Sequence, residues 1–366
     1  MPWFVWASIV SVTSILVGVY WDISWHMTVG RDSFWTPAHL AIQLGGIIAG
    51  IAGSFLIVTT TLRRTAPLRE SSIGVWGFRG PFGAFLAVWG AAAMLVSAPF
   101  DNWWHSAYGL DVKILSPPHA VLTLGILGVT TGGVLQIVAV CNRATGALRR
   151  RLELAMLATA GAITVLAMTA ILEHTFRSNL HTGDSYRAIA IVAPLILLAF
   201  GHASGRRWGA TIIAATYTGF MLAMLWLFPL FGAEPKLGPV YQPITHMIPL
   251  EFPVLIVVPA IALDLIRAHV RLRRVLLACV LGTVFVGVMI AVEWPFASFA
   301  MTEPARNAVF GSDYHPYFAQ PEWYGPRHEF FPDPAFASGM IHAVIAAVLG
   351  SWLGLTLGNA MRGVRR

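Results

Sequence analysis

The sequence predicts an all-α fold, a polytopic membrane helix bundle of about ten transmembrane helices. Of its 366 residues, 57% are hydrophobic and only 11% are charged, whereas soluble domains carry about 25% charged residues. Apolar runs recur along the whole chain, and each has the ~20 residues that a helix needs to cross the hydrocarbon core. The runs do not alternate between polar and apolar residues, which excludes a transmembrane β-barrel.

Ten apolar segments are the predicted spans: 3–21, 37–61, 80–100, 117–141, 153–173, 186–203, 208–231, 247–267, 274–295 and 338–360. The first lacks a basic leading segment and a small-residue cleavage site, so we expect a retained span rather than a removed signal peptide. Residues 1–145 would form two repeated helix hairpins. Residues 146–366 would form six further transmembrane helices, with a long outer loop at 297–337 that caps the outer face. His315, His328 and Glu329 are further candidate ligands in that loop.

The distribution of charge predicts the orientation. Seventeen of the 24 Lys and Arg residues lie in alternate connections and in the C-terminal segment. The positive-inside rule therefore places the protein in the inner (cytoplasmic) membrane, with both the N- and C-termini cytoplasmic. The net charge of +7 then reflects topology, and we expect no nucleic-acid partner. Ten of the twelve histidines fall in the opposite connections, on the outer or periplasmic face.

Two polar stretches on that face repeat one pattern. They read WDISWHMTVGRDSFWTPAH at 21–39 and FDNWWHSAYGLDVKILSPPH at 100–119. Each follows an apolar span, places His four residues after Asp, and closes with Pro before a second His that starts the next span. Residues i and i+4 share one face of a helix, and Pro suits the first helical turn. The repeat predicts two equivalent ligand groups: Asp22, His26 and His39 in the first, and Asp101, His105 and His119 in the second.

Two imidazoles and one carboxylate with an open coordination position suit Cu(II), Fe(II) or Zn(II), and an open position favours chemistry over a purely structural role. Interfacial Asp, His and Trp also anchor helix ends, but two copies with one layout favour metal binding. Further polar residues of the outer face could orient these ligands or form an additional site. They are Asp32, Asn102, Glu173, His174, His246, Glu251, Glu293 and His342.

The first group, with its x3 and x12 spacing and the phrase RDSFWTPAH, resembles the copper-site segment of one membrane subunit of the particulate methane and ammonia monooxygenases, the copper membrane monooxygenase family. The second group, with x3 and then x13, resembles the second metal site of the same polypeptide. This resemblance covers about residues 1–140. It implies copper at both groups, with iron and zinc as alternatives. The second site of the family typically opens with Asn, where this chain has Asp101.

The resemblance implies a membrane-bound copper-dependent oxidoreductase or monooxygenase, or a subunit of one, that activates O2 to hydroxylate a small apolar or ammonia-like substrate. The sequence has no haem CxxCH, dinucleotide-binding or Fe–S motif. We therefore expect an electron donor such as a quinol, along with the lipid bilayer, further membrane or periplasmic subunits and an oligomer. The alternatives are a non-enzymatic protein of copper transport, storage or sensing, and a scaffold subunit whose interfacial polar residues only form hydrogen bonds.

Overall fold

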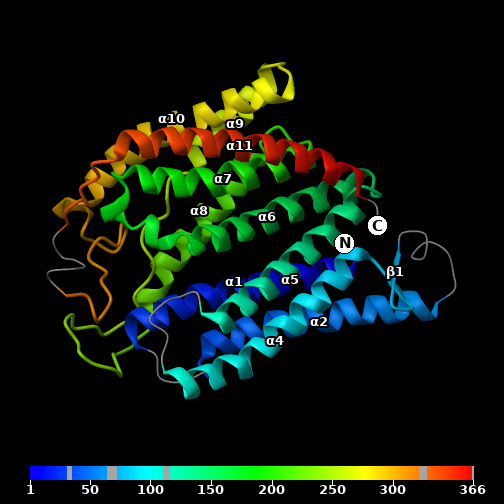
Figure 1. The fold of residues 1–366 in the computed structure, drawn as a ribbon, viewed down its shortest axis with the longest axis horizontal. Coiled ribbons are helices and arrows are strands. Elements are labelled where there is room, and N and C mark those ends of the chain that lie inside the picture. The colour runs from blue at the N-terminus through cyan, green and yellow to red at the C-terminus, as the bar shows by residue number, and fades with distance from the viewer. Residues whose placement is uncertain (31–34, 64–71, 110–115, 321–327, 365–366) are drawn as a thin grey trace. The chain divides into compact units, whose positions relative to one another are not determined.

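The computed structural model describes residues 1–30, 35–63, 72–109, 116–320 and 328–364, and it is mostly helical (Figure 1). Nine helices of these ranges are long and apolar enough to cross a membrane. They are α1 (Trp3–Thr28), α2 (Pro37–Leu62), α4 (Phe82–Tyr108), α5 (Pro117–Cys141), α6 (Gly146–Ala170), α7 (Gly183–Ser204), α8 (Gly209–Leu227), α10 (Arg274–Ala300) and α11 (Phe336–Gly363). The predicted all-α, multi-pass membrane fold is confirmed.

Short elements connect these helices. Strands β1 (Ile73–Val75) and β2 (Phe78–Gly80) form an antiparallel hairpin before α4. Four single-turn 3-10 helices lie in the second half of the chain: Leu172–His174, Arg177–Asn179, Phe228–Leu230 and Glu303–Ala305.

The predicted span at 247–267 is not one continuous helix. Residues 247–256 form no helix, and the helix α9 covers only Val257–His269. Pro249 and Pro253 explain the break, because proline lacks the amide donor and clashes with the preceding turn. The 13 residues of α9 extend ~20 Å, less than the ~30 Å of a bilayer core. The prediction of a tenth membrane-length helix is therefore wrong at this segment.

Polar side chains bind the backbone of the non-helical segment 247–256. They are Tyr20, Ser24 and Thr28 of α1, Tyr217 of α8 and Glu293 of α10. The Leu250 amide donates to Tyr20 Oη at 2.9 Å, and the Leu255 amide donates to a Glu293 carboxylate oxygen at 2.8 Å. Such partners are needed because an unsatisfied backbone group is costly where water is absent.

Replacing Tyr20 with Phe should lower the free energy of unfolding by about 1–3 kcal/mol, because the buried Leu250 amide loses its acceptor. Thermal unfolding of the detergent-solubilised protein measures the change. Tyr108→Phe is the matched control, since Tyr108 is 67% exposed and its substitution should leave the melting temperature unchanged. Equal melting temperatures for the two variants would show that this hydroxyl does not stabilise the segment.

The contacts divide the chain into two compact units. The first comprises Met1–Val19, Ser33–Thr159 and Met361–Arg366, and the second comprises Tyr20–Asp32 and Ala160–Ala360. The first unit holds most of the two predicted hairpins, and close helix packing holds it together. Gly90 of α4, for example, lies against the backbone of Gly125 and Val129 in α5, an approach that small residues permit.

Both chain ends lie at one end of the first unit. Phe4 packs against a cluster at the end of α2 and the start of α4 that includes Ile57 and Phe85. After α5, the side-chain amide of Asn142 donates to the carbonyl of Met361 at 2.8 Å. Because α4 and α5 are an antiparallel pair, the start of α4 and the end of α5 coincide. This is the arrangement expected if both termini face one side of a membrane; their cytoplasmic location stays a prediction.

Candidate metal centre

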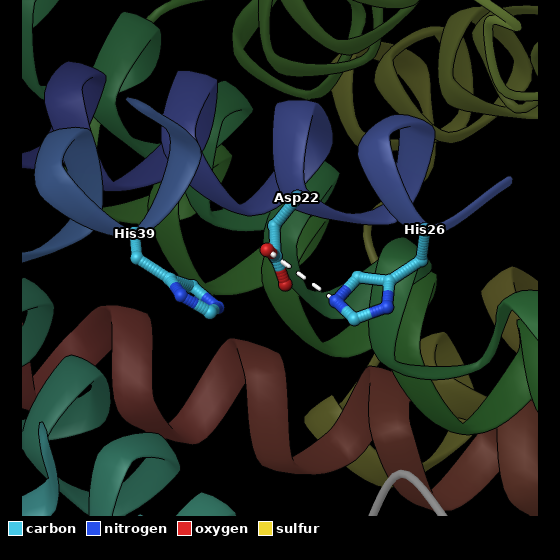
Figure 2. A group of neighbouring side chains, drawn as sticks. All are labelled: Asp22, His26 and His39. Carbon is cyan, nitrogen blue, oxygen red and sulfur yellow. Dashed lines mark ion pairs between the residues drawn. The ribbon is translucent and has the colours of Figure 1, made fainter. Parts of the chain in front are cut away.

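The paired Asp and His residues lie on helices. Helix α4 continues past the predicted span and carries Asp101 and His105 in its last turns, with 3.1 Å between His105 Nε2 and Asp101 Oδ1. Helix α1 likewise continues to Thr28 and carries Asp22 and His26, with 3.6 Å between His26 Nε2 and Asp22 Oδ1 (Figure 2). In both copies the i, i+4 spacing turns the imidazole toward the carboxylate.

His119 joins the pair on α4. It lies in the first turn of α5, which begins at Pro117, and its Nε2 is 3.7 Å from the same Asp101 oxygen. The structure therefore brings together all three members of the second predicted group. Asp101 is 7% exposed, so its carboxylate depends on nearby cationic or hydrogen-bonding partners for compensation.

The other ring nitrogen of each imidazole has an oxygen partner. His105 Nδ1 lies 3.0 Å from the carbonyl oxygen of Gly109, and His119 Nδ1 lies 3.0 Å from Ser116 Oγ. A carbonyl only accepts, so Nδ1 of His105 carries the proton and the lone pair of the neutral ring is on Nε2. Oxygen partners of this kind orient the imidazoles of metal sites and fix the tautomer.

His39 lies beside the second group within the first unit. It lines one pocket with Asp101 and His119, together with polar and apolar side chains of α2, α4 and α5: Ile42, Gln43, Ser97, Pro118 and Leu122. Imidazole and carboxylate groups thus form one wall of a cavity that aliphatic side chains also line. Such a mixture of mainly apolar lining and few polar groups is typical of a small-molecule site.

The close crossing of α1 and α2 determines the position of the first group. A Cβ atom added to Gly18 would lie 2.7 Å from the Ile42 nitrogen and 3.0 Å from the Ala38 oxygen. His39 lies between those two residues, in the first turn of α2. Helix α1 is unbroken from Gly18 to Thr28, so Asp22 follows the crossing by one helical turn on the same face.

The remaining predicted residues have varied surroundings. Asp32 lies outside the described residues. Asn102 is exposed although it follows the buried Asp101, because one residue turns the side chain by ~100° around the helix. Glu173, His174 and His342 are only partly buried or exposed, and His174 Nδ1 contacts Asp184 Oδ2 at 2.5 Å.

Three other predicted residues contact protein groups. Glu251 accepts the backbone amide of Arg177 at 2.6 Å and pairs with its guanidinium at 3.5 Å. His246 is half-buried, with its ring centroid 5.5 Å from that of Tyr314. Glu293, expected as an interfacial residue at the end of a span, is 1% exposed and binds the backbone of segment 247–256. For Glu251 and Glu293 the structure thus shows roles in holding the fold.

Some site residues were not singled out from the sequence. Ser116 precedes His119 by three residues, as Thr36 precedes His39, so the repeat offered a signal for it. Gly109 contributes only a backbone carbonyl, which no side-chain pattern reveals. Asp313 lies with His315 and His328 in a third cluster, and a segment without helical period gave no indication of that proximity.

Comparisons of the chain with models of protein families, with curated proteins and with solved structures find no match. The functional interpretation therefore depends on the geometry of the ligand groups and on the resemblance in residues 1–140.

Proposed function

We propose that the chain is a membrane-bound copper-dependent oxidoreductase, of the kind that the methane and ammonia monooxygenases represent, or a subunit of one. The observation that carries this proposal is the convergence of His105 Nε2 and His119 Nε2 on Asp101 Oδ1, at 3.1 and 3.7 Å. The proposal includes the predicted location in an inner membrane, with the ligand groups on its outer face, and the predicted need for an electron donor and for partner subunits.

The second group fits copper by its donor chemistry. Two imidazole nitrogens and one carboxylate oxygen suit Cu(II), with Fe(II) and Zn(II) as the alternatives. The Nδ1 contacts with Gly109 and Ser116 hold the rings with Nε2 toward Asp101. A bound cation would also compensate the buried negative charge of Asp101.

We propose that Asp22, His26 and His39 hold a second copper ion (Figure 2). Support comes from the contact between Asp22 and His26 and from the crossing of α1 over the first turn of α2. The crossing makes His39 the natural third ligand, as His119 is in the repeated unit. Both groups would then combine a helical Asp–His pair with a His from the start of the next helix.

Copper bound at these groups would supply one-electron redox chemistry toward dioxygen. The residues of the chain would bind and orient it, and the pocket beside Asp101 would admit the substrate. Its aliphatic lining, Ile42 and Leu122, favours a small apolar molecule that enters from the lipid, whereas Ser97 and Gln43 could bind a polar product.

Metal analysis and EPR spectroscopy of purified wild-type protein, His26→Ala and His105→Ala test the proposal. Each variant should lose about one copper ion relative to wild type, because removing one of three ligands opens the site. His269→Ala is the control, since His269 is exposed and its Nδ1 contacts its own helix at Leu265.

Unchanged copper content in both variants would overturn the ligand assignment. Copper loss without any oxygen consumption, across a panel of reductants and small substrates, would support the alternative of transport, storage or sensing. Oxygen consumption that requires both ligand groups would support the oxidoreductase.

A further inference from the structure

A second set of potential ligands lies in the connection between α10 and α11. Asp313, His315 and His328 each offer a ligand atom, and these atoms lie within 4.8 Å of one another. The two imidazole rings are 5.8 Å apart at their centroids and nearly perpendicular, at 86°. All three residues belong to the second unit, so their proximity does not depend on the hairpins of residues 1–145.

The nitrogens of this cluster suit coordination. Nε2 of His315 is buried, and among the described residues it has no hydrogen-bond partner. Nε2 of His328 lies 3.2 Å from the carbonyl oxygen of Ser312, which only accepts, so the lone pair of that neutral ring is on Nδ1. Asp313 is exposed, which gives an ion a path from water.

The backbone around these residues is held in place. Tyr317, two residues after His315, donates its amide to the Met27 carbonyl at 3.0 Å, and its own carbonyl accepts the Tyr241 amide at 2.8 Å. His328 adopts a positive φ of 48°, which is uncommon for a residue other than glycine. Ligands fixed in this way lose less conformational freedom when an ion binds.

The charges near the cluster restrict the kind of ion. Burial, together with the neighbouring positive charge of Arg177, lowers the pKa of His315 to about 4, so the ring is neutral near pH 7. Arg177 is itself paired with Glu251 at 3.5 Å. A site with two neutral imidazoles and one carboxylate suits Zn(II) or Cu(II) better than Ca²⁺ or Mg²⁺, which prefer several oxygen ligands.

We propose that Asp313, His315 and His328 form an additional transition-metal site for Zn(II) or Cu(II), separate from the two hairpin groups. Binding would join two parts of the outer connection, 313–315 and 328, and would stabilise its folded form. The site would thus be structural, in contrast to the redox role proposed for the hairpin groups.

The test uses the full-length chain with His26→Ala and His105→Ala, so that the hairpin groups cannot account for the result. After chelator treatment, titration with Zn(II) alone should show about one high-affinity site. Adding His315→Ala should weaken Zn(II) binding at least tenfold, and Asp313→Asn, an exposed change that preserves shape, should weaken it about tenfold. His342→Ala, at an exposed position of α11, should leave it unchanged.

Limited proteolysis supplies an independent readout. Zn(II) should slow cleavage within 301–335 in the background chain and should not do so after His315→Ala. Absence of Zn(II) binding in the background, or equal binding after His315→Ala and Asp313→Asn, would overturn the proposal. Protection by sulfate instead of Zn(II) would also overturn it, because it would identify an anion site formed with Arg177 and Arg306.

Discussion

Asp101→Asn should reduce the affinity of the second hairpin group for Cu(II) by at least ~100-fold. The carboxylate is the charged group on which His105 and His119 converge. A unit charge ~4 Å from another contributes about 4 kcal/mol at an effective dielectric constant near 20, and every ~1.4 kcal/mol is a factor of ten. Titration against a copper chelator of known affinity measures the change, and EPR identifies the site that is affected.

The same substitution should raise the reduction potential of copper at this group, because removing a negative charge destabilises Cu(II) more than Cu(I). It also converts Asp101 to the residue with which the second site of the resembled family typically opens. Asn102→Ala is the matched control, since Asn102 is the exposed neighbour of Asp101 and should not affect copper. An unchanged Cu(II) affinity in Asp101→Asn would show that the carboxylate is not a ligand.

The arrangement of the second group was predictable because its determinants are local. The spacing of Asp101 and His105 fixes their relation once the segment is helical, and Pro117 indicates where the next helix begins. A tight hairpin between α4 and α5 then brings His119 to the pair. The repeat of this pattern at 21–39 allowed the prediction without knowledge of any distant contact.

The fold at 247–269 was not predictable in this way, because its stability comes from residues distant in the sequence. Hydropathy alone predicts a span there, and Pro249 and Pro253 indicate only that a helix is interrupted. The partners of the exposed backbone, Tyr20 and Glu293, belong to helices elsewhere in the chain. The same reason explains why Glu293 was expected to be interfacial although it is buried.

Gly90→Ala should destabilise the first unit strongly and weaken copper binding at the second hairpin group. A Cβ atom at Gly90 would lie 2.5 Å from the Val129 nitrogen and 2.6 Å from the Gly125 oxygen. Both are backbone atoms, so relief requires α4 and α5 to separate. Overpacking of this kind costs typically about 1–3 kcal/mol and occasionally more. The separation would also move Asp101 on α4 away from His119 on α5.

Gly287→Ala in α10 is the matched control, because a Cβ atom there meets nothing within 4 Å and alanine favours a helix over glycine by about 1 kcal/mol. Thermal unfolding in detergent should therefore separate the variants, with Gly90→Ala below wild type and Gly287→Ala at or above it. Equal melting temperatures would contradict the close packing of α4 and α5. Full copper affinity in a destabilised Gly90→Ala protein would show that the ligand geometry tolerates movement of these helices, so the site would depend on the ends of α4 and α5 rather than on their crossing.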